Sequence, residues 1–112
     1  MEWKEIINEL FEDESGMNDL IDSIRNLNVT NVIYHDIDVG NYYASYHLVY
    51  ELDGKIYYAS DSHCSCDGCC EWYPEVYESR EFFIEVAKKW SHYGYYKKFE
   101  ILAAMGVSAD AC

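Results

Sequence analysis

The stretch with the clearest capacity for metal or redox chemistry is "SHCSCDGCCEW", residues 62–72, which holds four of the chain's five cysteines. Thiolates are strong zinc ligands, and a C-x-x-C spacing with a turn between the two thiols lets both face one ion. Cys66 and Cys69 have this spacing, and Asp67 and Gly68 supply the turn. The loop is therefore a candidate zinc site whose ligands would come from His63, Cys64, Cys66, Cys69 and Cys70.

The ligand set of this loop is incomplete, because structural zinc sites usually draw a second ligand pair from a separate segment. A histidine could complete it, and the sequence does not choose among the four in the chain. Two alternatives stay open. The cysteines could be small buried thiols in a tight loop, or a redox pair, which usually needs a helix directly after the first cysteine. Zinc is the one cofactor that the sequence suggests.

Two N-terminal helices are predicted from apolar residues at the spacings i, i+3 and i+4. The first helix covers Trp3 to Phe11, and the second follows an N-cap at Ser15 and extends to about Leu27. The few residues between them, around Gly16, would let the two helices form a hairpin.

From Val29 onward the pattern changes to the alternation of β-strands. In "VTNVIYHDIDV", residues 29–39, we expect one face to carry Val29, Ile33, His35, Ile37 and Val39. "YYASYHLVYEL" and "KIYYASD" are further strands, joined by Asp53-Gly54, a typical two-residue hairpin turn. After the cysteine loop, "EWYPEVY" predicts an edge strand, because Pro74 cannot donate a ladder hydrogen bond.

Two C-terminal helices complete the chain. Ser79 is a good N-cap for a helix whose apolar face would hold Phe82, Phe83, Val86, Ala87 and Trp90. The second helix, "YYKKFEILAAM", would end at Gly106 as its C′ residue. We therefore predict a single compact α+β domain over residues 1–112, with residues 107–112 as a frayed tail. Its order is ααβββ(β)αα: an antiparallel meander of three or four strands, with the helices packed on one sheet face.

The charge of the chain is strongly negative, with 21 acidic against eight basic residues and a net charge of −13. Such a field repels nucleic acids and anionic membranes, so we expect neither as a direct partner. No apolar stretch approaches the length of a membrane span, and the N-terminus has no basic segment followed by an apolar run. We expect a cytoplasmic protein and, as its partner, a basic surface on another protein. The acidic candidates for this contact are Glu2, Glu5, Glu9, Glu12 and Asp13.

The four glutamates in this set recur at helical spacing, which places neighbouring carboxylates about 5–6 Å apart on one helix face. This spacing is comparable to that of phosphates along a nucleic-acid strand, so the row could compete for a nucleic-acid groove. The alternative is a solvated helix face that keeps a small protein soluble.

Aromatic side chains are the second group of candidate contacts. Tyr42, Tyr46 and Tyr50 share one face of their strand, and Tyr43 shares the other with His47. One row should be core, and the other could form an exposed platform together with a tyrosine of the next strand. Because Tyr and Trp often anchor interfaces, the aromatic candidates are Tyr43, Tyr58 and Trp72. Packing within the sheet is the alternative, and a homo-oligomer stays open.

Catalytic motifs are missing from the sequence: it has no nucleophile elbow, metalloprotease helix or phosphate-binding glycine loop. His35, Asp36 and His47 could act as a base or an acid, but a histidine on a strand is usually structural. We expect no enzyme activity. Two other functions remain: binding of a nucleotide-like ligand on the tyrosine-rich sheet, and a small zinc-stapled domain with a metal or redox role.

The segment "YYASDSHCSCDGCCEWYPEVY", Tyr57–Tyr77, resembles part of small uncharacterised phage and prophage accessory proteins. In those proteins a strand ends in a His-Cys-Ser-Cys loop, followed by a glycine, a tryptophan and an acidic stretch. The pair Cys69-Cys70 departs from that pattern. The resemblance implies a phage-encoded accessory protein and assigns no catalytic residue. Together with the charge, it suggests an inhibitor of a nucleic-acid-handling host or defence protein, acting in the cytoplasm of an infected or lysogenic cell.

Overall fold

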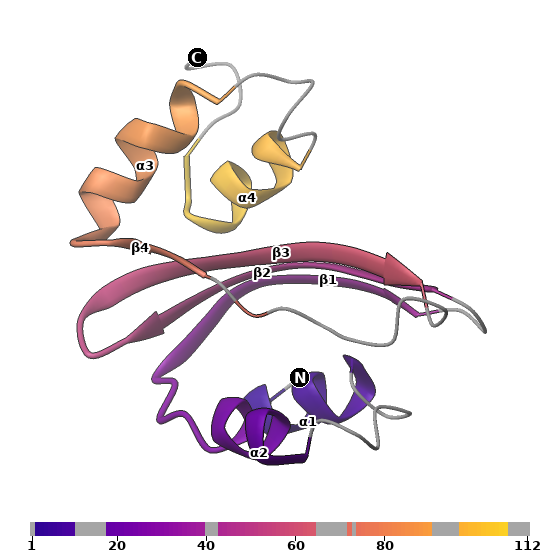
Figure 1. Cartoon of the computed structure of the whole chain (residues 1–112). Helices are drawn as coiled ribbons and strands as arrows, with labels where there is room; N and C mark the ends of the chain where they lie inside the picture. The colour runs from indigo at the N-terminus through magenta and orange to yellow at the C-terminus, as the bar shows by residue number, and fades with distance from the viewer. Residues whose placement is uncertain are drawn as a thin grey trace.

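A four-stranded antiparallel sheet forms the centre of the protein (Figure 1). The computed structural model describes residues 2–10, 18–39, 43–64, 72, 74–90 and 97–107. Each strand pairs with the next one along the chain, as predicted for a meander, and this gives the spatial order β1-β2-β3-β4. The strands are β1 (Asn31–Val39), β2 (Tyr43–Leu52), β3 (Lys55–Cys64) and β4 (Glu75–Tyr77).

Four helices flank the sheet within the described part of the chain, two before it and two after it, which confirms the predicted α+β order. Phe11, which we expected to end the first helix, and the predicted cap at Ser15 lie outside the described residues. The helices are α1 (Trp3–Leu10), α2 (Asn18–Arg25), α3 (Arg80–Lys88) and α4 (Lys98–Ala104).

The helices cover both faces of the sheet, so the prediction that all of them pack on one face is wrong (Figure 1). Tyr46, Leu48 and Tyr50 of β2 belong to a core with α1 and α2. Val49, on the opposite face of the same strand, belongs to a second core that includes Phe83 of α3. The physical reason is that β2 carries apolar side chains on both faces. A sheet solvated on one side would leave the second set in water, at about 1.5–3 kcal/mol for each large side chain.

A bulge in β1 changes which of its residues share a face. The pairing with β2 shifts between Val32 and Tyr34, so Ile33 is the extra residue. Ile33 and Tyr34 both pack against the α3–α4 core, whereas Val32 and Ile37 pack against the α1–α2 core. The predicted common face of Ile33 and Ile37 is therefore wrong, because one inserted residue reverses the alternation.

The predicted turn and cap residues adopt the expected geometry. Asp53 and Gly54 have φ angles of 54° and 79°, as a two-residue hairpin turn requires. The Ser79 side chain accepts a hydrogen bond from the Phe82 backbone N–H at 3.1 Å, which caps α3.

The end of α4 is also capped as predicted. Gly106 has a φ of 81°, and the Val107 N–H donates to the Leu102 carbonyl at 2.9 Å, as in a Schellman motif. Val107 packs against the α3–α4 core. The frayed tail that we expected from residue 107 therefore does not begin there, and residues 108–112 lie outside the described residues.

Candidate functional site

The N-terminal helix α1 has one apolar and one acidic side. Its apolar residues, Trp3, Ile6, Ile7 and Leu10, are at most 7% exposed. The predicted contact residues Glu5 and Glu9 are exposed on the other side, and Glu2 is exposed directly before the helix. Glu12 and Asp13, which we predicted to continue the row, lie outside the described residues.

Contacts between α1 and α2 hold this acidic side in place. The Trp3 indole N–H donates to the Ile24 carbonyl at 2.8 Å. Arg25 donates from Nε to the Asn8 side-chain oxygen at 2.7 Å and forms an ion pair with Asp22. Arg25 thus neutralises an acid of α2, and in the described part of the chain no cation forms an ion pair with Glu5 or Glu9.

The cysteine loop is only partly described. His63 and Cys64 end β3, where they pair with Ala44 and Tyr43 of β2. The other three predicted zinc ligands, Cys66, Cys69 and Cys70, lie outside the described residues. Among the residues that the structure describes, no group of three or more potential metal ligands comes together. The zinc site therefore stays a prediction.

The predicted exposed tyrosine platform is contradicted at Tyr58. Tyr58 is 4% exposed, and its ring packs on Trp90 with 5.1 Å between the ring centroids. The opposite row is buried as well, since Tyr46 and Tyr50 are each 1% exposed. Tyr46, Tyr50 and Tyr58 are buried because helices cover both sheet faces. This burial removes Tyr58 from the candidate contacts. Tyr43 begins β2.

Trp72, the third aromatic candidate, is half-buried and packs against the α1–α2 core. Its ring lies 5.7 Å from that of Tyr46 and 6.2 Å from that of Trp3, measured between centroids. Burial raises the pKa of the Tyr50 hydroxyl above its ordinary value, nearby Tyr57 adds to this increase, and a side-chain hydrogen bond with Trp72 opposes it. Trp72 thus belongs mainly to the α1–α2 core.

A polar cluster lies on the opposite sheet face, beside α4. We define it as Asp36 of β1, His47 of β2 and Lys97, the residue that precedes α4. Asp36 and His47 are paired across the two strands, and the Lys97 ammonium is 2.6 Å from the Asp36 carboxylate. A cavity of about 280 Å³ opens beside the cluster and is also lined by Asp38 and Ser45.

Three effects act on the pKa of His47. Partial burial lowers its pKa, the Asp36 carboxylate raises it, and the Lys97 ammonium lowers it, with a net decrease. His47 Nδ1 lies 3.2 Å from the hydroxyl of Tyr58, which orients the ring. The hydrogen bond with Asp36 raises the pKa of Lys97. The cluster thus places His47, whose pKa is lowered, beside an ion pair that connects Lys97 to β1.

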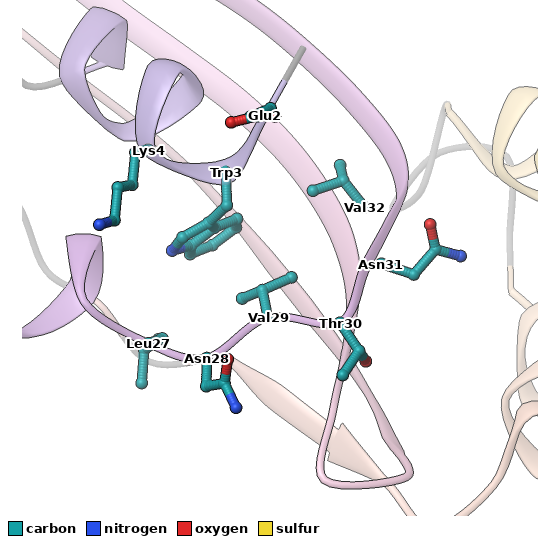
Figure 2. A pocket seen from close by; sticks show the side chains of 9 residues that line it. All are labelled: Glu2, Trp3, Lys4, Leu27, Asn28, Val29, Thr30, Asn31 and Val32. Carbon is teal, nitrogen blue, oxygen red and sulfur yellow. The ribbon is translucent and has the colours of Figure 1, made fainter.

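An open groove of about 560 Å³ lies between the start of α1 and the segment that leads into β1. Figure 2 shows the side chains of Val29 and Val32 turned toward the Trp3 indole, while Asn31 points away. Glu2, Lys4, Asn28 and Thr30 add polar groups to its lining.

Sequence reasoning missed two exposed apolar residues near the edge of the sheet that β4 forms. Val76 of β4 is 51% exposed and Phe82 of α3 is 50% exposed, so the predicted core position of Phe82 is wrong. The core side of α3 is taken by Phe83 and Ala87, which are both fully buried, and Phe82 lies about 100° away from Phe83 around the helix. The glutamates at positions 78, 81 and 85 mark the solvent side and could have identified Phe82.

Comparisons with protein families, curated proteins and solved structures find no match to this chain. In the described ranges, no helix is long and apolar enough to cross a membrane.

Proposed function

We propose that the protein is a non-enzymatic binding protein whose acidic helix layer docks on a basic surface of another protein. The observation that supports this proposal is the two-sided character of α1. Its apolar side is at most 7% exposed, while Glu5 and Glu9 face solvent without an ion-pair partner among the described residues.

The negative charge of such a surface would make it prefer basic partners. Complementary charges accelerate association and discriminate against like-charged partners. The net charge of −13 extends this preference for cations beyond the helix. Because α1 is fixed to α2 by the Trp3 and Arg25 hydrogen bonds, the carboxylates are presented from a rigid layer.

The finer part of the proposal concerns the class of partner. Glu5 and Glu9 are four residues apart on α1, which places their Cβ atoms about 5–6 Å apart. A basic groove that normally holds phosphates could accept such a row. We therefore propose a nucleic-acid-handling protein of a host cell as the partner, with inhibition by nucleic-acid mimicry.

Charge reversal on α1 tests the proposal. The variant Glu5→Lys/Glu9→Lys should fail to retain nucleic-acid-binding proteins from a bacterial lysate that the wild type retains. Rising salt and added duplex DNA should release them from the wild type. The matched control is Glu81→Lys/Glu85→Lys, which makes the same charge change on exposed positions of α3, across the sheet. Equal retention by the wild type and both variants would contradict a role for the α1 face.

A further inference from the structure

The carboxylate of Asp36 lies beside two groups that can both carry a positive charge. Its direct partner is Lys97, whose ammonium is 2.6 Å away. Its neighbour across the strands is His47, which is paired with it in the register of β1 and β2. Side chains directly opposite each other in an antiparallel sheet have Cβ atoms about 4.5–5.5 Å apart. A protonated His47 therefore competes with Lys97 for the same carboxylate.

The surroundings of His47 include polar groups from each neighbouring element. Ser60 of β3 is paired with His47, and the Tyr58 hydroxyl lies 3.2 Å from its Nδ1 atom. The titratable groups of the described residues around this cluster are Asp36 and Asp38 of β1, Tyr58 of β3 and Lys97 before α4, while Tyr34 of β1 and Glu100 of α4 act on Lys97 in turn. Lys97 is the cation in this set, so it is the group that a proton on His47 repels.

The coupling between His47 and Lys97 is mutual. The Lys97 ammonium lowers the pKa of His47, which means that it opposes a proton on the imidazole. Free-energy coupling between two sites is reciprocal, so a proton on His47 disfavours the position of Lys97 by the same amount. Asp36 acts on His47 in the other direction, because its carboxylate attracts the imidazolium. Protonation of His47 therefore shifts Asp36 from one cation toward the other.

Lys97 is also the residue at which the first turn of α4 begins. Its carbonyl accepts a hydrogen bond from the Ile101 backbone N–H at 2.9 Å. Its side chain makes no capping hydrogen bond to the helix, and its contact with Asp36 ties this turn to β1. The rest of α4 is held independently, because Lys98 and Leu102 are buried. Loss of the ion pair should therefore loosen the first turn and leave the helix packed.

We propose that the ion pair between Asp36 and Lys97 is an acid-sensitive latch: protonation of His47 draws the carboxylate to the imidazolium and releases the first turn of α4 from β1. The cavity of about 280 Å³ beside the cluster gives the released side chain room to move. Because burial lowers the pKa of His47, the latch is closed at neutral pH and opens only below about pH 6.5. The latch lies beside α4, across the sheet from α1, so it does not rest on the proposed function (Figure 1).

Hydrogen exchange of two matched amides tests the latch. The Ile101 N–H makes the first-turn bond of α4, and the Phe83 N–H makes the corresponding bond of α3, to the Ser79 carbonyl at 3.0 Å. Exchange is measured on the whole protein from about pH 7 to about pH 5, where ordinary aspartates stay ionised, and is expressed as protection factors. The protection of Ile101 should fall about two- to fivefold, as expected for the loss of one partly exposed ion pair. That of Phe83 should not change.

Three variants separate the latch from other effects of acid. In His47→Gln the Ile101 amide should keep its protection at both ends of the pH range. In Lys97→Gln the protection should be low already at neutral pH and should not fall further. His35→Gln removes an exposed histidine of β1 instead and should behave as the wild type does. Wild-type protection of Phe83 at neutral pH shows that each variant is folded.

NMR spectra of the His47 ring, recorded on the same samples, show when the imidazole takes up its proton. The inference is overturned if His47 is protonated while Ile101 keeps its protection, or if the protection falls equally in His47→Gln. A ring that stays uncharged down to about pH 5 also overturns it, because the latch then has no trigger in this range. So does an equal fall at Phe83, which would mean that the whole domain opens.

Discussion

The ammonium of Lys97 lies 2.6 Å from the carboxylate of Asp36, so the residue that precedes α4 is joined to an edge strand of the sheet. Asp36 is also paired with His47 across β1 and β2. The electrostatic state of His47 therefore reports on the contact between α4 and the sheet.

Removing either partner of this ion pair should shift the pKa of His47 in opposite directions. Lys97→Gln deletes a cation that lowers the pKa, so the pKa should rise, whereas Asp36→Asn deletes the carboxylate that raises it, so the pKa should fall. An NMR titration of the His47 ring would measure both. Because the two side chains are 25% and 35% exposed, each variant should lose only about 0.5 kcal/mol of unfolding free energy. Shifts in the same direction would mean that local refolding, not charge, dominates.

The depressed pKa of His47 predicts a stability that decreases in acid. The unfolded chain takes up a proton near the ordinary histidine pKa of about 6.5, whereas the folded chain resists it until lower pH. The contribution of His47 is therefore fully present above about pH 6.5 and is lost as the pH falls toward the folded-state pKa. Urea denaturation across this range should show a smaller pH-dependent loss in His47→Gln. His35→Gln, which alters an exposed histidine of β1, is the control and should behave as the wild type does.

The adjacent phenylalanines of α3 should respond very differently to truncation. Phe83 is fully buried, with its ring 5.0 Å from Tyr77 and 5.6 Å from Trp90 between centroids. Phe83→Ala should lower the free energy of unfolding by about 3–5 kcal/mol. Phe82 is half exposed, so Phe82→Ala should cost about 1 kcal/mol or less. Equal losses in urea denaturation would show that Phe82 is more buried than described.

Much of this fold can be predicted from local patterns, because helical and strand periodicities and the residues at turns depend on neighbours in the sequence. Ser79, Asp53-Gly54 and Gly106 each occupy the place expected of them. The covering of both sheet faces was implicit in β2, where Val49 is apolar between Leu48 and Tyr50. A period of two shows which residues share a face but does not show how many faces are covered.

The polar cluster and the bulge could not be predicted in this way. Lys97 and Asp36 are distant in the sequence and meet only because α4 packs beside β1. The bulge at Ile33 is a single unpaired residue within an ordinary strand pattern, and its position depends on the partner strand. Contacts of this kind depend on tertiary packing, which local periodicity does not encode.

The buried lysine of α4 should be essential for the end of α3. Lys98 is 6% exposed, and its ammonium donates to the carbonyls of Lys88 at 2.7 Å and Trp90 at 3.1 Å. These carbonyls lie at and just after the end of α3, where the helix itself provides no partner. Lys98→Met keeps the aliphatic packing but removes these hydrogen bonds, so it should cost about 1–3 kcal/mol of unfolding free energy. Lys89→Met, at an exposed neighbouring position, should be nearly neutral. Hydrogen exchange should become faster in the last turn of α3 in the first variant alone, because the loss of the cap frees that turn before the rest of the domain opens.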